Sequence, residues 1–117
     1  MSGAVNHRAG LSAEQSVARY YERAGRVIAE TRWRGPAGEI DLIARAGAEV
    51  IFIEVKQSRT IAHAAQQLSP RQMARICASA SAFLAGEPAG QDTAARFDVA
   101  LVDEQGRIEV IENAFSV

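Results

Sequence analysis

G-E-I-D-L-I-A at residues 38–44 and F-I-E-V-K at residues 52–56 are the two segments that decide the fold of this chain. Both lie in runs rich in apolar and β-branched residues, and Ala46-Gly47 between them suits a tight turn, so they predict a β-hairpin. Side chains alternate between the two faces of a strand. A loop with an even number of residues would place Asp41 opposite Phe52 or Glu54, on the face that carries Glu54 and Lys56.

This register would gather two carboxylates and one ammonium at one end of the hairpin. Strands are depleted in acidic residues, and like charges placed side by side repel. A divalent cation between the carboxylates would offset that repulsion, because Mg²⁺ commonly takes one or two carboxylates, several waters and substrate phosphate oxygens. A bound metal acidifies water and stabilises displacement at phosphorus, and a nearby lysine can neutralise the developing charge. The alternative is a solvated patch with a salt bridge.

The segments before the hairpin predict a helix over residues 12–24 and a strand over residues 26–34. The helix has an apolar stripe at helical spacing. Glu14 precedes Val17 and Tyr21 of that stripe by three and seven residues, so we expect it to project from the buried side.

The segments after the hairpin begin with a polar, irregular stretch over residues 57–68. Ser69 is expected to cap a second helix, with Pro70 at its first position. Strands are expected over residues 97–102 and 107–111. The order is α-β-β-β-α-β-β, which predicts an α/β sandwich with a mixed sheet.

Length and composition predict one domain over residues 11–117, after a flexible lead-in over residues 1–10. With 48% hydrophobic and 23% charged residues, the chain is typical of a soluble globular protein rather than a disordered one. No apolar run is long enough to span a membrane, so no membrane partner is expected. One cysteine and two isolated histidines exclude a disulfide framework and the common zinc sites, and favour a cytoplasmic location.

The net charge of −1 excludes a globally basic nucleic-acid binder. Residues 1–75 nevertheless hold 11 basic and 7 acidic residues, against 2 and 7 in residues 76–117. A local basic face could attract phosphates, and a random split of surface charge explains the counts equally well. Lys56 is the only lysine among the 13 basic residues. The candidate phosphate contacts are Arg32, Arg34, Arg59, Arg71 and Arg75.

The hairpin segments resemble the signature of the PD-(D/E)XK nucleases. More closely, they resemble the YraN-like bacterial family, an uncharacterised family related to archaeal Holliday-junction resolvases. The resemblance spans most of the chain and includes Glu14, Ser69-Pro70-Arg71, Arg96-Phe97-Asp98-Val99 and Asn113-Ala114-Phe115. It implies a restriction-endonuclease-like three-layer sandwich, in which helices flank a central mixed β-sheet.

The same resemblance implies roles for individual residues. Asp41 and Glu54 would ligate Mg²⁺ or Mn²⁺, helped by the Val55 carbonyl, with Glu14 as a further acidic ligand. Lys56 would be the catalytic lysine. Gln57 stands where several superfamily members carry a glutamine that orients the site.

The chain also departs from the family pattern. Gln57 and Ser58 replace the more usual small residue and arginine, and Arg59 comes one place later. Gln72 stands where a lysine is common. These departures leave the metal ligands intact and alter the expected phosphate contacts.

The expected function is therefore a metal-dependent endonuclease acting on DNA, with branched or repair intermediates as candidate substrates. The alternative is a nuclease-fold module that binds nucleic acid or a protein partner without cleaving. Related enzymes often dimerise to cut two strands, so a homodimer is a candidate assembly.

Overall fold

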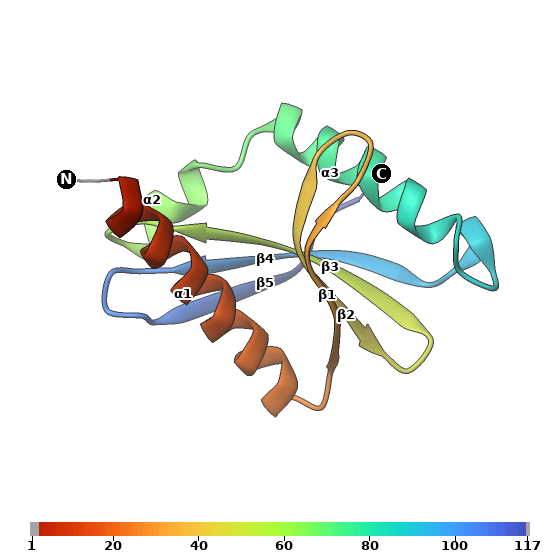
Figure 1. The fold of residues 1–117 in the computed structure, drawn as a ribbon, viewed down its shortest axis with the longest axis horizontal. Coiled ribbons are helices and arrows are strands. Elements are labelled where there is room, and N and C mark those ends of the chain that lie inside the picture. Colours follow the sequence, from red (N-terminus) through yellow and green to blue (C-terminus); the bar gives the residue numbers. More distant parts are fainter. Residues whose placement is uncertain (1–2, 117) are drawn as a thin grey trace.

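The computed structural model describes residues 3–116, and for residues 3–11 it describes the backbone only. A five-stranded sheet in the order β1-β2-β3-β4-β5 forms its centre, and only the β3–β4 pair is parallel (Figure 1). The elements are α1 (Gly3–Arg23), β1 (Val27–Arg34), β2 (Glu39–Ala46), β3 (Glu49–Gln57), α2 (Ile61–Gln66), α3 (Pro70–Leu84), a short 3-10 helix (Gly90–Asp92), β4 (Ala95–Val102) and β5 (Ile108–Phe115). The predicted α/β architecture with a mixed sheet is confirmed.

The hairpin of β2 and β3 has the register that the site requires. Leu42 pairs with Ile53, and the pairing continues to Ala46 and Glu49. The loop therefore consists of residues 47 and 48, so the prediction of an even number is confirmed. Gly47 adopts φ +63°, and a glycine with positive φ is characteristic of two-residue hairpin turns.

Helices cover both faces of the sheet because the side chains of β3 alternate. Ile51 and Ile53 face α1, whereas Val50 and Phe52 face α3. Ala64 of α2 packs on the same face as α3, against β4. The result is three layers, with α1 alone on one side and α2 and α3 on the other.

The predicted start of the first helix is wrong, and the segment predicted to be irregular contains a helix. Helix α1 begins at Gly3 rather than near Ser12, so residues 3–10 of the expected lead-in are helical, while residues 1 and 2 lie outside the described residues. That stretch contains no proline, so its backbone can continue the helix. The segment expected to be irregular contains α2, whose first turn is capped by the Thr60 hydroxyl accepting from His63 N at 3.1 Å.

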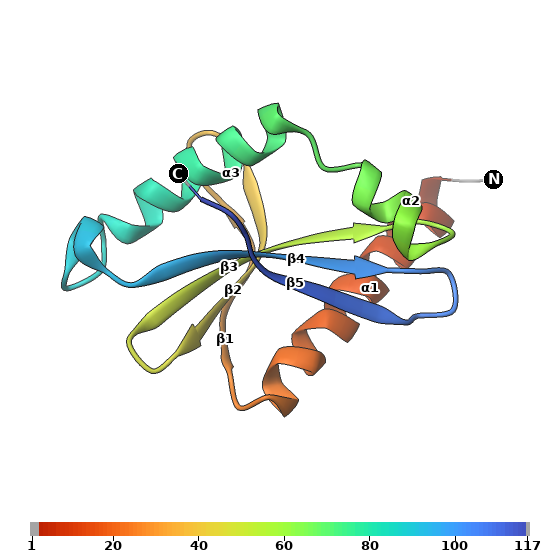
Figure 2. The same ribbon diagram turned by 180° about the vertical axis from the view of Figure 1, so that it is seen from behind.

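The last strand is longer than predicted, because β5 continues to Phe115. Figure 2 shows its end passing beside α3. Phe115 stacks there on Phe97, with ring centroids 5.0 Å apart. This packing extends the apolar layer beneath α3.

The turn between β1 and β2 is fastened to α3 by Ser79, which is fully buried. The Ser79 hydroxyl donates to Gly38 O at 2.8 Å and accepts from Ala37 N at 3.3 Å. A Cβ added at Gly35 would lie 2.6 Å from Ser79 Cβ and Oγ, so this close approach requires glycine. The contact holds the beginning of β2, and with it Asp41, beside α3.

No helix within residues 3–116 is both long and apolar enough to cross a membrane.

Candidate metal centre

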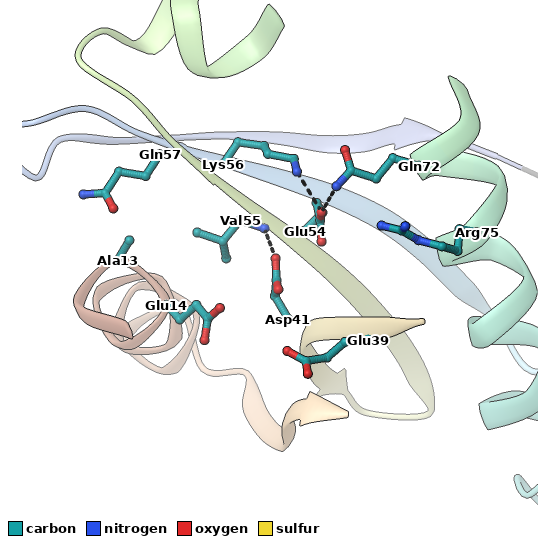
Figure 3. Close-up of a pocket in the computed structure, with 10 residues that line it drawn as sticks. All are labelled: Ala13, Glu14, Glu39, Asp41, Glu54, Val55, Lys56, Gln57, Gln72 and Arg75. Atoms are coloured by element: carbon teal, nitrogen blue, oxygen red, sulfur yellow. Dashed lines mark hydrogen bonds and ion pairs between the residues drawn. The ribbon is translucent and has the colours of Figure 1, made fainter. Parts of the chain in front are cut away.

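The candidate site lies where β2 and β3 separate. Their pairing ends at Leu42 and Ile53, and beyond this point the Asp41 side chain accepts a hydrogen bond from Val55 N at 2.8 Å. A cavity of about 450 Å³ opens at this point (Figure 3). It is lined by Ala13, Glu14, Glu39, Asp41, Glu54, Val55, Lys56, Gln57, Gln72 and Arg75.

Glu54 is the buried centre of this cavity, with 6% of its surface exposed. Its Oε2 accepts a hydrogen bond from Gln72 Nε2 at 3.0 Å and lies 3.1 Å from Lys56 Nζ. Burial raises the pKa of Glu54 to about 8, and the hydrogen bond to Asp41 and its charge raise it as well, whereas Lys56 acts in the opposite direction. Asp41 and Glu54 thus line the same cavity, and their carboxyl groups are close enough to interact.

Glu14 borders the cavity from α1, as its helical phase predicts. Figure 3 shows its carboxyl group directed toward Asp41. Burial and the charge of Asp41 raise the pKa of Glu14 to about 7, Arg32 lowers it, and Glu39 raises it. Among the described residues, however, no three His, Cys, Asp or Glu side chains gather around one point. The acidic core of the site is thus the pair Asp41 and Glu54.

This pair suits a hard dication. Two neighbouring carboxylates repel unless a proton or a cation lies between them, and burial, followed by the interaction with Asp41, raises the pKa of Glu54. Mg²⁺ and Mn²⁺ prefer oxygen ligands, and a site of two carboxylates completed by water is usual for Mg²⁺. The donor set therefore fits the metal that the sequence predicted, with one or two protein carboxylates rather than a closed cage.

The candidate nucleic-acid contacts divide into three groups by their position relative to the cavity. Gln57 and Arg75 line the cavity. Arg32 lies beside it, with Nε 3.4 Å from Glu39 Oε1, and its φ of +51° is unusual for a residue other than glycine. The cavity lining does not include Arg34, Arg59 or Arg71.

One contact that the sequence did not predict is the hydrogen bond from Gln72 to Glu54. Gln72 lies in the first turn of α3, where its backbone N donates to the Ser69 hydroxyl at 3.2 Å, so the predicted cap is confirmed. Gln72 precedes buried Ile76 by four residues, and this helical phase indicates that it faces the sheet.

Comparison with known proteins places the chain among uncharacterised relatives. The family described as "Uncharacterised protein family UPF0102" matches residues 13–102. A UPF0102 protein of Cereibacter sphaeroides is 70% identical over 116 residues, covering 99% of both chains. A UPF0102 protein of Ruegeria pomeroyi is 61% identical over 113 residues, covering 97% of this chain and 92% of the relative. One from Dinoroseobacter shibae is 41% identical over 104 residues, covering 89% and 78%.

Proposed function

The chain belongs to the UPF0102 family, and from the geometry of its cavity we propose that it is a metal-dependent nuclease that hydrolyses phosphodiester bonds of DNA. The observation that carries the proposal is that the carboxyl groups of Asp41 and Glu54 line one solvent-open cavity together with Lys56, which pairs with Glu54. The resemblance of the hairpin to the PD-(D/E)XK signature supports the same activity. Branched or repair intermediates are the substrates we favour, and the cytosol is the location we propose.

The functional group of each side chain in the cavity indicates its role in the proposed reaction. Asp41 and Glu54 would hold Mg²⁺ or Mn²⁺, which supplies an acidified water and stabilises charge on the phosphate. Lys56 cannot ligate a cation, because an ammonium has only donors. It stands beside Glu54 with protons to donate, so it can orient a water or neutralise a phosphate oxygen. Gln72 keeps the Glu54 carboxylate in place from α3.

The alternative function is a module that binds nucleic acid or a protein partner without cleaving it. The observation in its favour is that Gln72, an uncharged side chain, lines the cavity at a position where the resemblance to the nuclease family implies a lysine. In either case, a homodimer is the assembly we propose for engaging two strands.

The test is a cleavage assay on linear, branched and flapped DNAs with Mg²⁺ or Mn²⁺, with a chelator as the blank. The matched control is Asp41→Asn, which keeps the size of the side chain and removes its charge. Cleavage by the wild type that disappears in both controls supports the nuclease. Metal-dependent binding without cleavage of any DNA supports the binding module.

A further inference from the structure

The side chain of Arg75 is seated on the turn between β1 and β2. A Cβ added at Gly38 would come within 3.1 Å of Arg75 Cδ and Nε, and within 3.4 Å of Cγ, so the arginine stem fills the space of a side chain at position 38. The hydrogen bond from Ser79 to Gly38 O fastens this turn to the helix that carries Arg75. The stem is thus held between two fixed elements, although the residue is exposed.

Within residues 12–116, the Lys56 ammonium has a carboxylate partner and the Arg75 guanidinium has none. Figure 3 shows it directed from α3 toward the cavity. Lys56 is engaged by Glu54, with Nζ 3.1 Å from Oε2. No ion pair joins Arg75 to a carboxylate of residues 12–116, although four acidic side chains line the same cavity. Arg75 therefore presents an unpaired positive charge at the opening of the site.

We propose that Arg75, seated on Gly38, binds the phosphate of the nucleic acid that enters this cavity. A guanidinium offers two parallel N–H donors that match two phosphate oxygens, which an ammonium cannot do. The ligand identity rests on the proposed nuclease function. The choice of Arg75 among the five candidate arginines rests on its place in the cavity lining and on its contact with Gly38, and the missing ion pair separates it from Arg32.

The acidic pair makes this contact depend on metal. The negative charge of the Asp41 and Glu54 pair repels a phosphate, and a dication bound to the pair would remove the repulsion. Arg75 should therefore contribute to DNA affinity mainly when a dication is present. An arginine that only contacts DNA on the outer surface should contribute equally with and without metal.

The experiment measures the Kd of a fluorescent DNA duplex by anisotropy, first with Ca²⁺ in place of Mg²⁺ to suppress cleavage and then with a chelator. Arg75→Ala should weaken binding roughly tenfold with Ca²⁺ and less than about twofold with the chelator. With Ca²⁺, the dependence of log K on log salt should become shallower by about 0.9, the value for one duplex phosphate. Arg75→Lys should recover part of the affinity and not all of it.

The matched control is Arg71→Ala, which removes an exposed cation from the same helix outside the cavity and should show the same change in both solutions. Gly38→Ala should resemble Arg75→Ala, and the double variant should bind no more weakly than either single variant. Circular dichroism checks the folding of each variant. If Gly38→Ala does not fold, the comparison of Arg75→Ala with the wild type still tests the inference.

Two results would overturn the inference, and they are distinguishable. If the wild type binds DNA and Arg75→Ala changes its Kd equally in both solutions, or not at all, Arg75 is not the residue that binds the phosphate in the cavity. If the wild type binds no DNA in either solution, the proposed function fails together with the inference.

Discussion

Replacing Glu54 with glutamine should remove the main pH dependence of folding in the metal-free protein. Glu54 is buried, and burial together with Asp41 raises its pKa from 4.5 to about 8. Between these two values the folded protein holds a proton that the unfolded chain has lost. The free energy of unfolding therefore falls as pH rises from 4.5 to 8, and the stabilisation is fully present only below pH 4.5.

The size of the effect follows from the same shift. Each pKa unit corresponds to about 1.4 kcal/mol, so raising the pH through this range should remove about 3–5 kcal/mol of unfolding free energy. Glutamine has nearly the shape of a protonated glutamate and keeps an oxygen that can accept from Lys56 and Gln72. The Glu54→Gln variant should thus be more stable than the wild type above pH 8, while Glu14 leaves a weaker dependence of the same sign.

The assay is urea unfolding at intervals from pH 4.5 to 9 in the presence of a chelator, followed by circular dichroism. The control is Glu104→Gln, in an exposed turn between β4 and β5. The wild type and the control should lose stability as pH rises, whereas Glu54→Gln should lose much less. Equal pH profiles for wild type and Glu54→Gln would show that Glu54 is ionised at neutral pH, and the account of the acidic pair would be wrong.

Three further perturbations test separate parts of the structure. Lys56→Ala should abolish cleavage while leaving Mn²⁺ binding and folding largely unchanged. Calorimetry and a cleavage assay on one preparation measure both properties. If the variant cleaves DNA at the rate of the wild type, the proposed role of Lys56 is wrong. Tyr21→Phe removes the buried hydrogen bond to Asp98 Oδ2 at 2.7 Å and should lower the free energy of unfolding by about 1–2 kcal/mol in urea titrations. Gly35→Ala places a Cβ 2.6 Å from Ser79 and should cost about 1–3 kcal/mol by the same method, unless the turn moves freely off α3.

The sequence could predict the hairpin because the information is local. Alternation fixes which side chains of β3 share a face, and a two-residue loop transfers that parity to β2. Asp41, Glu54 and Lys56 could therefore be brought together from residue positions alone. The helical phase of Glu14 relative to Val17 gave its direction in the same way.

The rest of the site depends on contacts between distant segments, which no local pattern encodes. The place of Arg75 above Gly38 arises because the β1–β2 turn docks on α3, through a serine in the helix and a glycine in the turn. The left-handed backbone of Arg32 is likewise absent from any sequence signal. Helix α2 was missed because its only local marker is Thr60, and a single capping residue carries little weight by itself.

Placing Asp41 beside Glu54 is electrostatically unfavourable, so contacts elsewhere in the fold must hold the helices that border the two carboxyl groups. On one face, Tyr21 anchors α1 through its hydrogen bond to fully buried Asp98, two helical turns beyond Glu14. On the other, Ser79 joins α3 to the turn that leads to Asp41, two helical turns beyond Gln72. Both anchors are buried and lie away from the cavity. The charged residues of the site can therefore repel one another without releasing either helix, and the dication that we propose would enter a cavity whose walls are already in place.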